Sequence, residues 1–345
     1  MLGLLPAVER VFEYLPGSGV PGERARSTPY DEKLLASDWP AAGAIEFRDV
    51  RLRYADGLPL ALAGLELSVA GGEKLGVVGR TGAGKSTVLV ALFRLVEPCG
   101  GSVLVDGTDV GRVGLKALRS SLAMIPQEAV LIEGTAGENL DPFGVFDRAE
   151  LESVLVKVGL PPKLIDSQVG AAGEQLSVGE RQLVAIARIL LRKVTRTPPL
   201  FVFFAACFAD WVRPASQSKV VVMDEPTAHI DPETDARVQQ MVRVEFAQAT
   251  LITVAHRLHT IADFDRVLVM DVGRAAECDT PSELLRKPGG IFADMVRALG
   301  SEAASAICDK ANTKPEFVSF ADEDGKGDHN FVSFEYDLDF ITGDA

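Results

Sequence analysis

The sequence predicts an α/β fold built on a mostly parallel β-sheet, and three observations lead to this prediction. Short apolar runs of strand character alternate along the chain with segments of helical character. A glycine-rich loop at residues 79–86 stands between one such strand and a helix. The apolar run 220–223 leads directly into Asp224 and Glu225. In a parallel sheet both features lie at the carboxyl ends of strands, where ligands bind.

The expected strands are short runs of apolar or alternating residues bounded by turns. In chain order they are residues 45–53, 65–69, 74–78, 102–105, 220–223, 251–254 and 266–270. The expected helices show longer, helix-like patterning and occupy residues 86–96, 115–122, 178–191 and 232–246, and residues 128–175 are rich in helix.

Composition limits the classes of function. The chain has 345 residues, of which 47% are hydrophobic and 24% charged, as in a globular protein with a sizeable core. The net charge of −14 argues against non-specific nucleic-acid binding, which needs a basic face. The four cysteines are far apart and form no CxxC pair, so neither a disulfide framework nor a zinc site is indicated. The longest uncharged apolar run, residues 200–209, is shorter than the roughly 18 residues that a membrane-spanning helix needs.

Residues 79–86 fit the pattern G-x-x-x-x-G-K-[ST]. Glycines let backbone N–H groups face phosphate oxygens without Cβ clashes, and the following helix adds its positive amino-terminal end. In this pattern Lys85 reaches the β- and γ-phosphates, and the Ser86 hydroxyl binds Mg²⁺. The alternative, a chance glycine-rich turn, does not explain the strand and helix on either side.

The acidic pair that follows the run 220–223 suits the same chemistry. Asp224 is placed to hold Mg²⁺ through water, and Glu225 to act as the general base that polarises the attacking water. The alternative is a pair of solvated surface acids. The four apolar residues leading straight into the pair argue against it.

Further motifs make the chain resemble the ABC-type ATPases. They lie in the family's order over about 200 residues and resemble its adenine-stacking aromatic, Q-loop, signature, Walker B, D-loop and switch histidine. In this sequence they are Tyr54, Gln127 in IPQ, residues 176–182 (LSVGERQ), residues 224–228 (DEPTA), Ile230-Asp231, and His256 in TVAHR.

The resemblance implies a P-loop NTPase (RecA-like) fold with a mostly parallel core. An antiparallel β-subdomain is expected near residues 45–75, and a helical signature subdomain near 128–188. The implied cofactors are ATP and Mg²⁺, with catalytic roles for Glu225, His256, Gln127 and Lys85. The implied metal ligands are Ser86, Gln127 and Asp224. The implied ATP contacts are Tyr54, Gly79, Arg80, Thr81, Gly82, Ala83, Gly84, Lys85, Ser86 and Thr87, with Ser177 and Gly179 acting on the nucleotide of a partner.

The segments GEKLGVVGRTGAGKST, IPQEAVLIEGTAGENLDPFG and LSVGERQ resemble the C-type, multidrug-resistance-associated subfamily, and in particular its second nucleotide-binding domain. This resemblance covers roughly residues 8–300. It implies ATP hydrolysis that powers export, a head-to-tail dimer with a second ABC domain, transmembrane-domain partners and a place at the cytoplasmic face of a membrane. No nucleic-acid partner is implied. Residues 1–44 are expected to be the linker from a membrane domain, and residues 45–300 the ATP-binding domain.

Three alternatives remain open at this stage. The chain could be a nucleotide sensor that hydrolyses slowly or not at all, although Glu225 argues against this. It could be a soluble ABC ATPase that serves no transporter, although the C-type motifs and the linker-like residues 8–16 argue against that. A truncated, inactive product is the third.

The signature departs from the usual LSGGQ at two positions. Val178 replaces a glycine, as is common in C-type members, and Glu180 stands where glutamine is usual. An acid there would weaken contact with a partner's triphosphate by like-charge proximity unless it turns away. His229 in the D-loop, usually a small residue, is a lesser departure.

Two segments are anomalous. Ser177 and Asp224 are 47 positions apart, and removing residues 194–217 would join ARILLRK to SKVVVMDEPTA as the resemblance leads us to expect. We interpret this segment as a retained intron of 24 codons, because Val194 after Lys193 and Gln217 at its end are the residues that splice-site nucleotides would encode. The alternative is a long apolar surface loop. Residues 301–345, with 11 acidic and 3 basic side chains, are predicted to be a disordered acidic tail.

Overall fold

The structure is a computed structural model. It describes residues 27–312 except 38, 128, 143, 171–172, 174, 195–218, 225–231 and 256. Nearly all of the anomalous segment 194–217 therefore lies outside the described residues, as do residues 1–26 and 313–345. Glu225, His229 and His256 also lie outside them.

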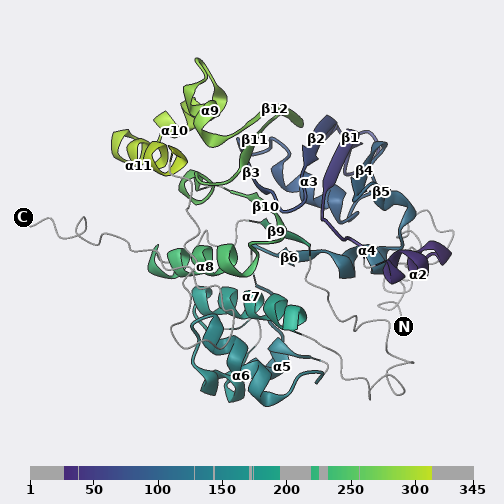
Figure 1. Cartoon of the computed structure of the whole chain (residues 1–345), viewed down its shortest axis with the longest axis vertical. Helices are drawn as coiled ribbons and strands as arrows, with labels where there is room; N and C mark the ends of the chain where they lie inside the picture. The colour runs from purple at the N-terminus through teal and green to yellow at the C-terminus, as the bar shows by residue number, and fades with distance from the viewer. Residues whose placement is uncertain are drawn as a thin grey trace, which may run out of the picture.

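The centre of the molecule is a six-stranded sheet in the order β12-β11-β3-β10-β9-β6 (Figure 1). Its first five strands in chain order run parallel, and β12 is antiparallel to β11 at the edge. The mostly parallel core is therefore confirmed. The strands are β3 (Lys74–Gly79), β6 (Ala123–Ile125), β9 (Val220–Asp224), β10 (Thr250–Val254), β11 (Arg266–Asp271) and β12 (Arg274–Asp279).

A four-stranded antiparallel sheet in the order β2-β1-β4-β5 lies beside the core. Its strands are β1 (Ile45–Leu52), β2 (Leu62–Val69), β4 (Gly100–Val105) and β5 (Thr108–Asp109). The predicted β-subdomain near residues 45–75 was therefore drawn too narrowly, because β1 pairs with β4 as well as with β2. The alternating pattern of β1 shows that one face is buried, but it does not say which strand lies alongside.

Helices α3 (Lys85–Leu92), α4 (Leu115–Ser121) and α8 (Pro232–Glu245) accompany the core strands, together with the 3-10 turns η1 (Val110–Arg112) and η5 (Leu258–Thr260). A separate helical layer contains α5 (Ala136–Leu140), α6 (Arg148–Lys157), the turn η2 (Pro162–Asp166) and α7 (Val178–Val194), with the short hairpin β7 (Gly134–Thr135) and β8 (Gln168–Val169).

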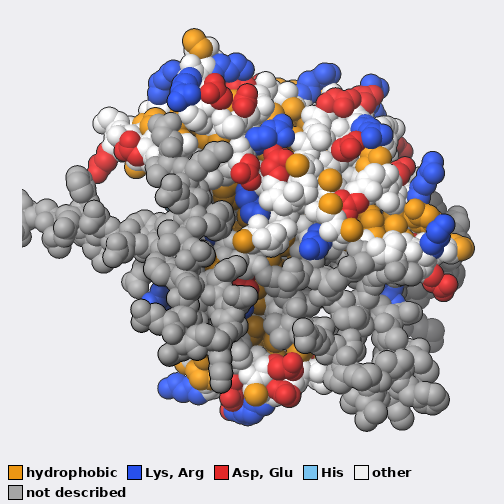
Figure 2. Space-filling model, in the orientation of Figure 1, with side chains coloured by type: hydrophobic (Ala, Val, Ile, Leu, Met, Phe, Trp, Pro, Cys, Tyr) orange, Lys and Arg blue, Asp and Glu red, His pale blue; other side chains and the backbone are white. Residues whose placement is uncertain are grey.

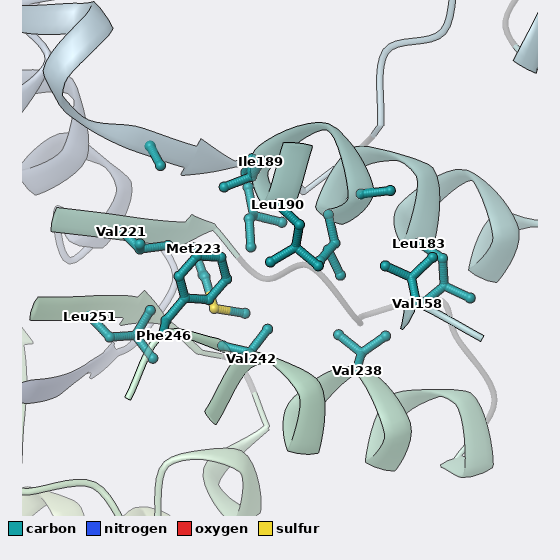
Figure 3. Packing of buried hydrophobic residues seen from close by; sticks show 14 of the residues in the cluster. Val158, Leu183, Ile189, Leu190, Val221, Met223, Val238, Val242, Phe246 and Leu251 are labelled. Atoms are coloured by element: carbon teal, nitrogen blue, oxygen red, sulfur yellow. The ribbon is translucent and has the colours of Figure 1, made fainter. Parts of the chain in front are cut away.

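Within this layer helix α7 lies nearest the core, between α5 and α6 on one side and α8 on the other, and it continues beyond the expected boundary at residue 188 (Figure 1). Ile189 and Leu190 of α7 pack beside Val221 and Met223 of β9 (Figure 3). Buried apolar side chains therefore join the signature helix directly to the acidic strand β9.

The residues before β1 pack against the domain. Helix α2 (Pro29–Ala36) buries Asp31 and Leu34, and the buried Trp39 indole donates to the Val105 carbonyl at 3.0 Å. The described part of the expected linker, residues 27–44, is thus anchored on the antiparallel sheet.

The carboxyl-terminal part adds helices α9 (Pro281–Arg286), α10 (Ile291–Arg297) and α11 (Ser301–Asn312). The expectation of disorder is wrong for residues 301–312. Ile307 is 2% exposed in the core, and the Lys310 ammonium donates to the His259 carbonyl at 2.9 Å. The burial of Ile307 and the contact of Lys310 hold this segment on the domain, although its sequence shows only weak helical periodicity. Among the helices in the described part of the chain, none has the length and apolarity needed to cross a bilayer.

Candidate nucleotide-binding site

The backbone of the loop after β3 requires glycine at two positions. At Gly79 (φ +150°) an added Cβ would lie 2.3 Å from the Met270 carbonyl oxygen of β11. At Gly84 (φ +97°), immediately before α3, it would lie 2.7 Å from the Ala61 carbonyl oxygen. Backbone atoms cannot swing away as a flexible side chain can, so a side chain at either position would deform the loop.

Lys85 lies inside this loop. Its side chain is buried, and the ammonium donates to the carbonyls of Gly79 at 2.9 Å and Arg80 at 3.2 Å. Arg80, Thr81, Gly82 and Ser86 are exposed, whereas Ala83 and Thr87 are buried. The loop therefore presents one side to solvent around a centrally held cation, as a phosphate-binding loop must.

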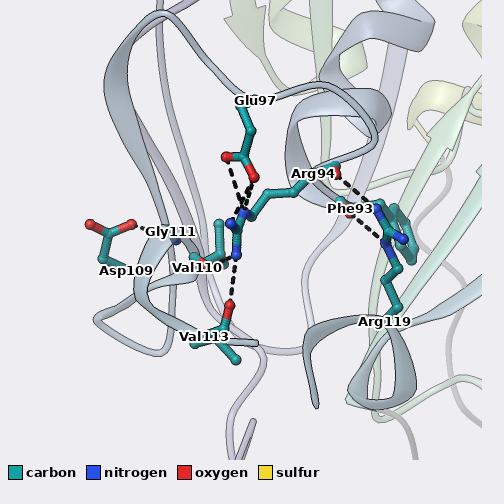
Figure 4. A network of polar contacts seen from close by, with 8 residues as sticks. All are labelled: Phe93, Arg94, Glu97, Asp109, Val110, Gly111, Val113 and Arg119. Atoms are coloured by element: carbon teal, nitrogen blue, oxygen red, sulfur yellow. Dashed lines mark hydrogen bonds and ion pairs between the residues drawn. The ribbon is translucent and has the colours of Figure 1, made fainter. Parts of the chain in front are cut away.

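The far end of α3 is anchored by two arginines (Figure 4). The buried Arg94 guanidinium donates to the carbonyls of Val110 at 2.8 Å and Val113 at 2.6 Å and pairs with Glu97. Arg119 of α4 donates to the carbonyls of Phe93 and Arg94 at the carboxyl end of α3. The bonds from Arg119 tie the residues directly after α3 to α4, and those from Arg94 tie the same point to η1.

Strand register places the other candidate groups at the same edge of the sheet. Val254 of β10 pairs with Val77 of β3 on one side and with Asp224 of β9 on the other. Ile125 of β6 pairs with Met223. The loop from Gly79, the Asp224 carboxylate and Gln127 therefore all follow the carboxyl ends of neighbouring strands. Glu225, which follows Asp224, and His256, which is two positions after Val254 in sequence, lie outside the described residues.

Tyr54 reaches the same region from the antiparallel sheet. The residue is 53% exposed, and its hydroxyl lies 3.0 Å from the Thr87 Oγ1 of α3. An exposed aromatic ring held at its polar end beside the phosphate loop offers a stacking surface for a base.

The donor set fits a magnesium nucleotide. Ser86, Gln127 and Asp224 supply hydroxyl, amide and carboxylate oxygens, which are the hard ligands that Mg²⁺ prefers. The buried ammonium of Lys85, the close backbone approach at Gly79 and Gly84, and the amino-terminal end of α3 suit a polyphosphate. The residues present thus match both parts of the expected ligand.

The signature residues form the first turn of α7. Ser177 and Val178 are exposed, and Glu180 folds back onto this turn. The Ser177 N–H donates to the Glu180 carboxylate at 2.8 Å, and the Glu180 N–H donates to the Ser177 hydroxyl oxygen at 3.2 Å. This reciprocal pair is a capping box. The acid is therefore held beside Ser177.

Comparisons with known proteins agree with this geometry. The family model of ABC transporters matches residues 62–196. ATP-binding cassette sub-family C member 3 of Rattus norvegicus is 41% identical over 302 residues, which are 85% of this chain and 18% of that protein. The chain carries an ABC transporter ATP-binding domain.

Other matches extend over most of this ATP-binding domain. ABC transporter C family member 3 of Dictyostelium discoideum is 38% identical over 319 residues, covering 91% of this chain and 20% of the relative. A bacterial Atm1-family ABC exporter with ATP bound superposes with a TM-score of 0.67 at 30% identity, covering 87% of this chain and 48% of that one. The chain thus spans about a fifth of the length of its C-subfamily relatives.

Sequence reasoning missed the contacts that connect helix α7 of the ATP-binding domain to the segment carrying Gln127, including the one made by Gln182, which it named only as part of the motif at residues 176–182. The buried Gln182 side chain of α7 donates to the Pro126 carbonyl at 2.9 Å, and Arg188 donates to the Val130 carbonyl at 2.6 Å. The available signal was a polar residue on an apolar helical stripe, because Gln182 precedes the buried Ile186 by four positions.

The surface of the ATP-binding domain carries mixed charge. Over the described part of the face in Figure 2, acidic and basic side chains lie next to one another, and a continuous basic field is absent there. This mixture of charges accompanies the net charge of −14 of the whole sequence.

Proposed function

We propose that this chain binds Mg²⁺-ATP and hydrolyses it as the motor domain of a C-type ABC exporter. The observation that carries the proposal is the common sheet edge, where the glycine-constrained loop around Lys85, the Asp224 carboxylate and Gln127 follow adjacent parallel strands. The similarity to C-subfamily proteins supports the C-type assignment, and the similarity to a bacterial ABC exporter supports the export role.

Each group has a distinct task in this proposal. Tyr54 stacks on the adenine, the loop N–H groups and Lys85 bind the phosphates, and Ser86, Gln127 and Asp224 hold the metal. When bound, Mg²⁺ neutralises charge that develops on the β- and γ-phosphate oxygens. Glu225 accepts a proton from the attacking water, and His256 orients the γ-phosphate.

A second ABC domain completes the site. Ser177 and Gly179 are exposed or half-buried at the start of α7, as groups that contact another molecule's nucleotide must be. In a head-to-tail dimer, ATP is held between the phosphate loop of one domain and the signature of the other. ATP binding closes this dimer and hydrolysis reopens it.

The surface beside Gln127 suits docking of the transmembrane domains. Val130 and Ile132 expose 72% and 52% of their area, although their backbone is held firmly. The fully buried Asn139 side chain bonds both the N–H and the carbonyl of Ile132, and Arg188 bonds the carbonyl of Val130. Exposed apolar groups on a rigid support are typical of an interaction surface. Docking there places the chain at the cytoplasmic face of a membrane.

Turnover tests the proposal directly. We expect the chain alone to hydrolyse Mg²⁺-ATP slowly, with a rate that rises faster than linearly with protein concentration because two chains make each site. Glu225→Gln should retain ATP binding and lose about 10²–10⁴-fold in turnover, the typical cost of losing a general base. Glu152→Gln, which removes a partly exposed acid of α6 paired with Arg148, is the matched control and should behave as wild type.

The outcomes separate the alternatives. ATP binding without turnover at any concentration, with or without a second ABC domain, would favour a nucleotide sensor. Rapid turnover by a demonstrated monomer would refute the composite site. Full turnover in Glu225→Gln would remove Glu225 from its role as base.

A further inference from the structure

Helix α7 holds the segment that carries Gln127 at two points. The Gln182 amide donates to the Pro126 carbonyl at 2.9 Å, directly before Gln127. Six residues further along the helix, Arg188 donates to the Val130 carbonyl at 2.6 Å. Six helical residues span about 9 Å, so the two bonds hold the segment across more than one turn of α7.

The same helix begins with the signature residues. Ser177 is exposed five positions before Gln182, and the capping box of Ser177 and Glu180 makes the first turn rigid. Beyond this turn, Val184, Ile186 and Leu190 are almost fully buried. A helix packed in this way moves as a unit, so a displacement at Ser177 is carried to Gln182.

Gln182 is poorly explained as a packing residue. Its side chain is 2% exposed in a stretch of α7 whose neighbouring buried positions are apolar. An apolar side chain there would pack without the cost of burying an amide. Its bond to Pro126 offsets that cost and at the same time fixes the backbone next to Gln127.

We infer that Gln182 is a positioning residue for Gln127, so that the signature helix, which faces a partner's nucleotide, sets the metal affinity of this chain's own site. The inference rests on the proposed function in two respects, namely that Gln127 is a metal ligand and that the signature residues contact a partner's nucleotide. Residues that orient a metal ligand commonly change metal affinity by about 10–100-fold when they are replaced.

Gln182→Met tests this inference, because methionine keeps the length of the side chain and lacks the amide donor. Gln239→Met is the matched control. Gln239 is a partly buried glutamine of α8 whose side chain lies 3.4 Å from Asp235, away from the Gln127 segment. Two measurements are made on the full chain: amide hydrogen exchange without nucleotide, and the Mg²⁺ concentration for half-maximal ATP hydrolysis.

We expect Gln182→Met to raise exchange about tenfold in peptides covering residues 124–131. It should also raise the half-maximal Mg²⁺ concentration about tenfold. Binding of a fluorescent ATP analogue in EDTA should stay as in wild type, because the phosphate loop is untouched. Gln239→Met should leave all three readouts unchanged.

The inference is overturned if exchange in residues 124–131 is unchanged in Gln182→Met. It is equally overturned if exchange rises there while the Mg²⁺ dependence stays that of wild type, since Gln182 would then be only structural. Absence of Mg²⁺-dependent turnover in the wild-type chain would count against the proposed function instead. In that case the exchange result would still decide whether Gln182 holds the segment.

Discussion

The phosphate loop and the signature turn differ in how their shapes are made. The phosphate loop is shaped by its backbone, since Gly79 and Gly84 approach carbonyl oxygens so closely that no side chain fits, and Lys85 is buried within it. The signature turn is an ordinary capped helix start with Ser177 and Val178 exposed. A loop preorganised in this way can bind a ligand by itself, whereas an exposed turn needs a second surface.

The largest loss of ATP affinity is expected from a change in the backbone of the phosphate loop. Gly79→Ala should weaken binding of a fluorescent ATP analogue by about 100-fold or more, because backbone strain of a few kcal/mol must be relieved by moving the loop. Gly107→Ala is the matched control. Gly107 also has positive φ (+73°), but an added Cβ there meets open space. Equal affinity in Gly79→Ala and wild type would contradict the backbone argument.

A smaller loss of ATP affinity is expected at Tyr54, which reaches the same site from the antiparallel sheet. Tyr54→Ala should weaken ATP binding by about 1–3 kcal/mol, the usual contribution of an aromatic ring stacked on a base. Tyr54→Phe loses only the contact with Thr87 and should bind nearly as wild type. Titration with ATP and with a triphosphate lacking a base separates the contribution of base stacking from that of phosphate binding. If both ligands weaken equally in Tyr54→Ala, the ring does not stack.

In the signature turn we expect a modest gain, in ATP-dependent self-association, in contrast to the two losses of ATP affinity above. Glu180→Gln keeps a residue suited to the capping box and removes a negative charge beside Ser177. ATP-dependent self-association should rise a few-fold, in line with about 0.3–1 kcal/mol for a charge at a helix terminus. Glu138→Gln alters the matching capping box of α5 and is the control, with no change expected by analytical ultracentrifugation. Weaker association in Glu180→Gln would mean that the carboxylate itself supports the contact.

The smallest effect concerns helix α2, whose Leu34 lies in the same buried cluster as the α3 side chains. Burial alone raises the pKa of the Asp31 carboxyl, but donors on Gly114 and Thr28 outweigh burial and hold the pKa below its ordinary value. Because the folded-state pKa is depressed, the stabilisation is complete above the unfolded-state pKa and is lost as pH falls through the folded-state value. The stability difference between wild type and Asp31→Asn, measured by urea unfolding, should therefore shrink in acid. A difference independent of pH would rule out ionised Asp31 as the cause.

The nucleotide site was predictable because its parts are local in sequence. The strand, the glycines, Lys85 and the start of α3 occupy about a dozen consecutive residues, and the steric needs of phosphate binding act on those residues directly. Asp224 was predictable for a related reason, because an apolar run that ends in acids places them at the ligand edge of a parallel sheet.

Other features depended on partners distant in the chain. The pairing of β1 with β4, the bond from Gln182 to Pro126 and the docking of α11 through Ile307 each join residues far apart in sequence. Local patterning says that a face is buried or that a polar group needs a partner, but it does not name the partner. The direction of the Glu180 carboxylate was also undecided, since both solvent and the Ser177 N–H were available to it.

The amino-acid sequence by itself determined the α/β class, the phosphate loop, the acidic strand and the order of the ABC motifs, because short-range sterics and hydrophobic periodicity encode them. Only the tertiary structure decided which strands form the antiparallel sheet, that residues 301–312 fold as a docked helix, and that the signature helix holds the backbone beside Gln127. Those features follow from the packing of distant segments, in which each buried group is satisfied by whatever the fold brings next to it.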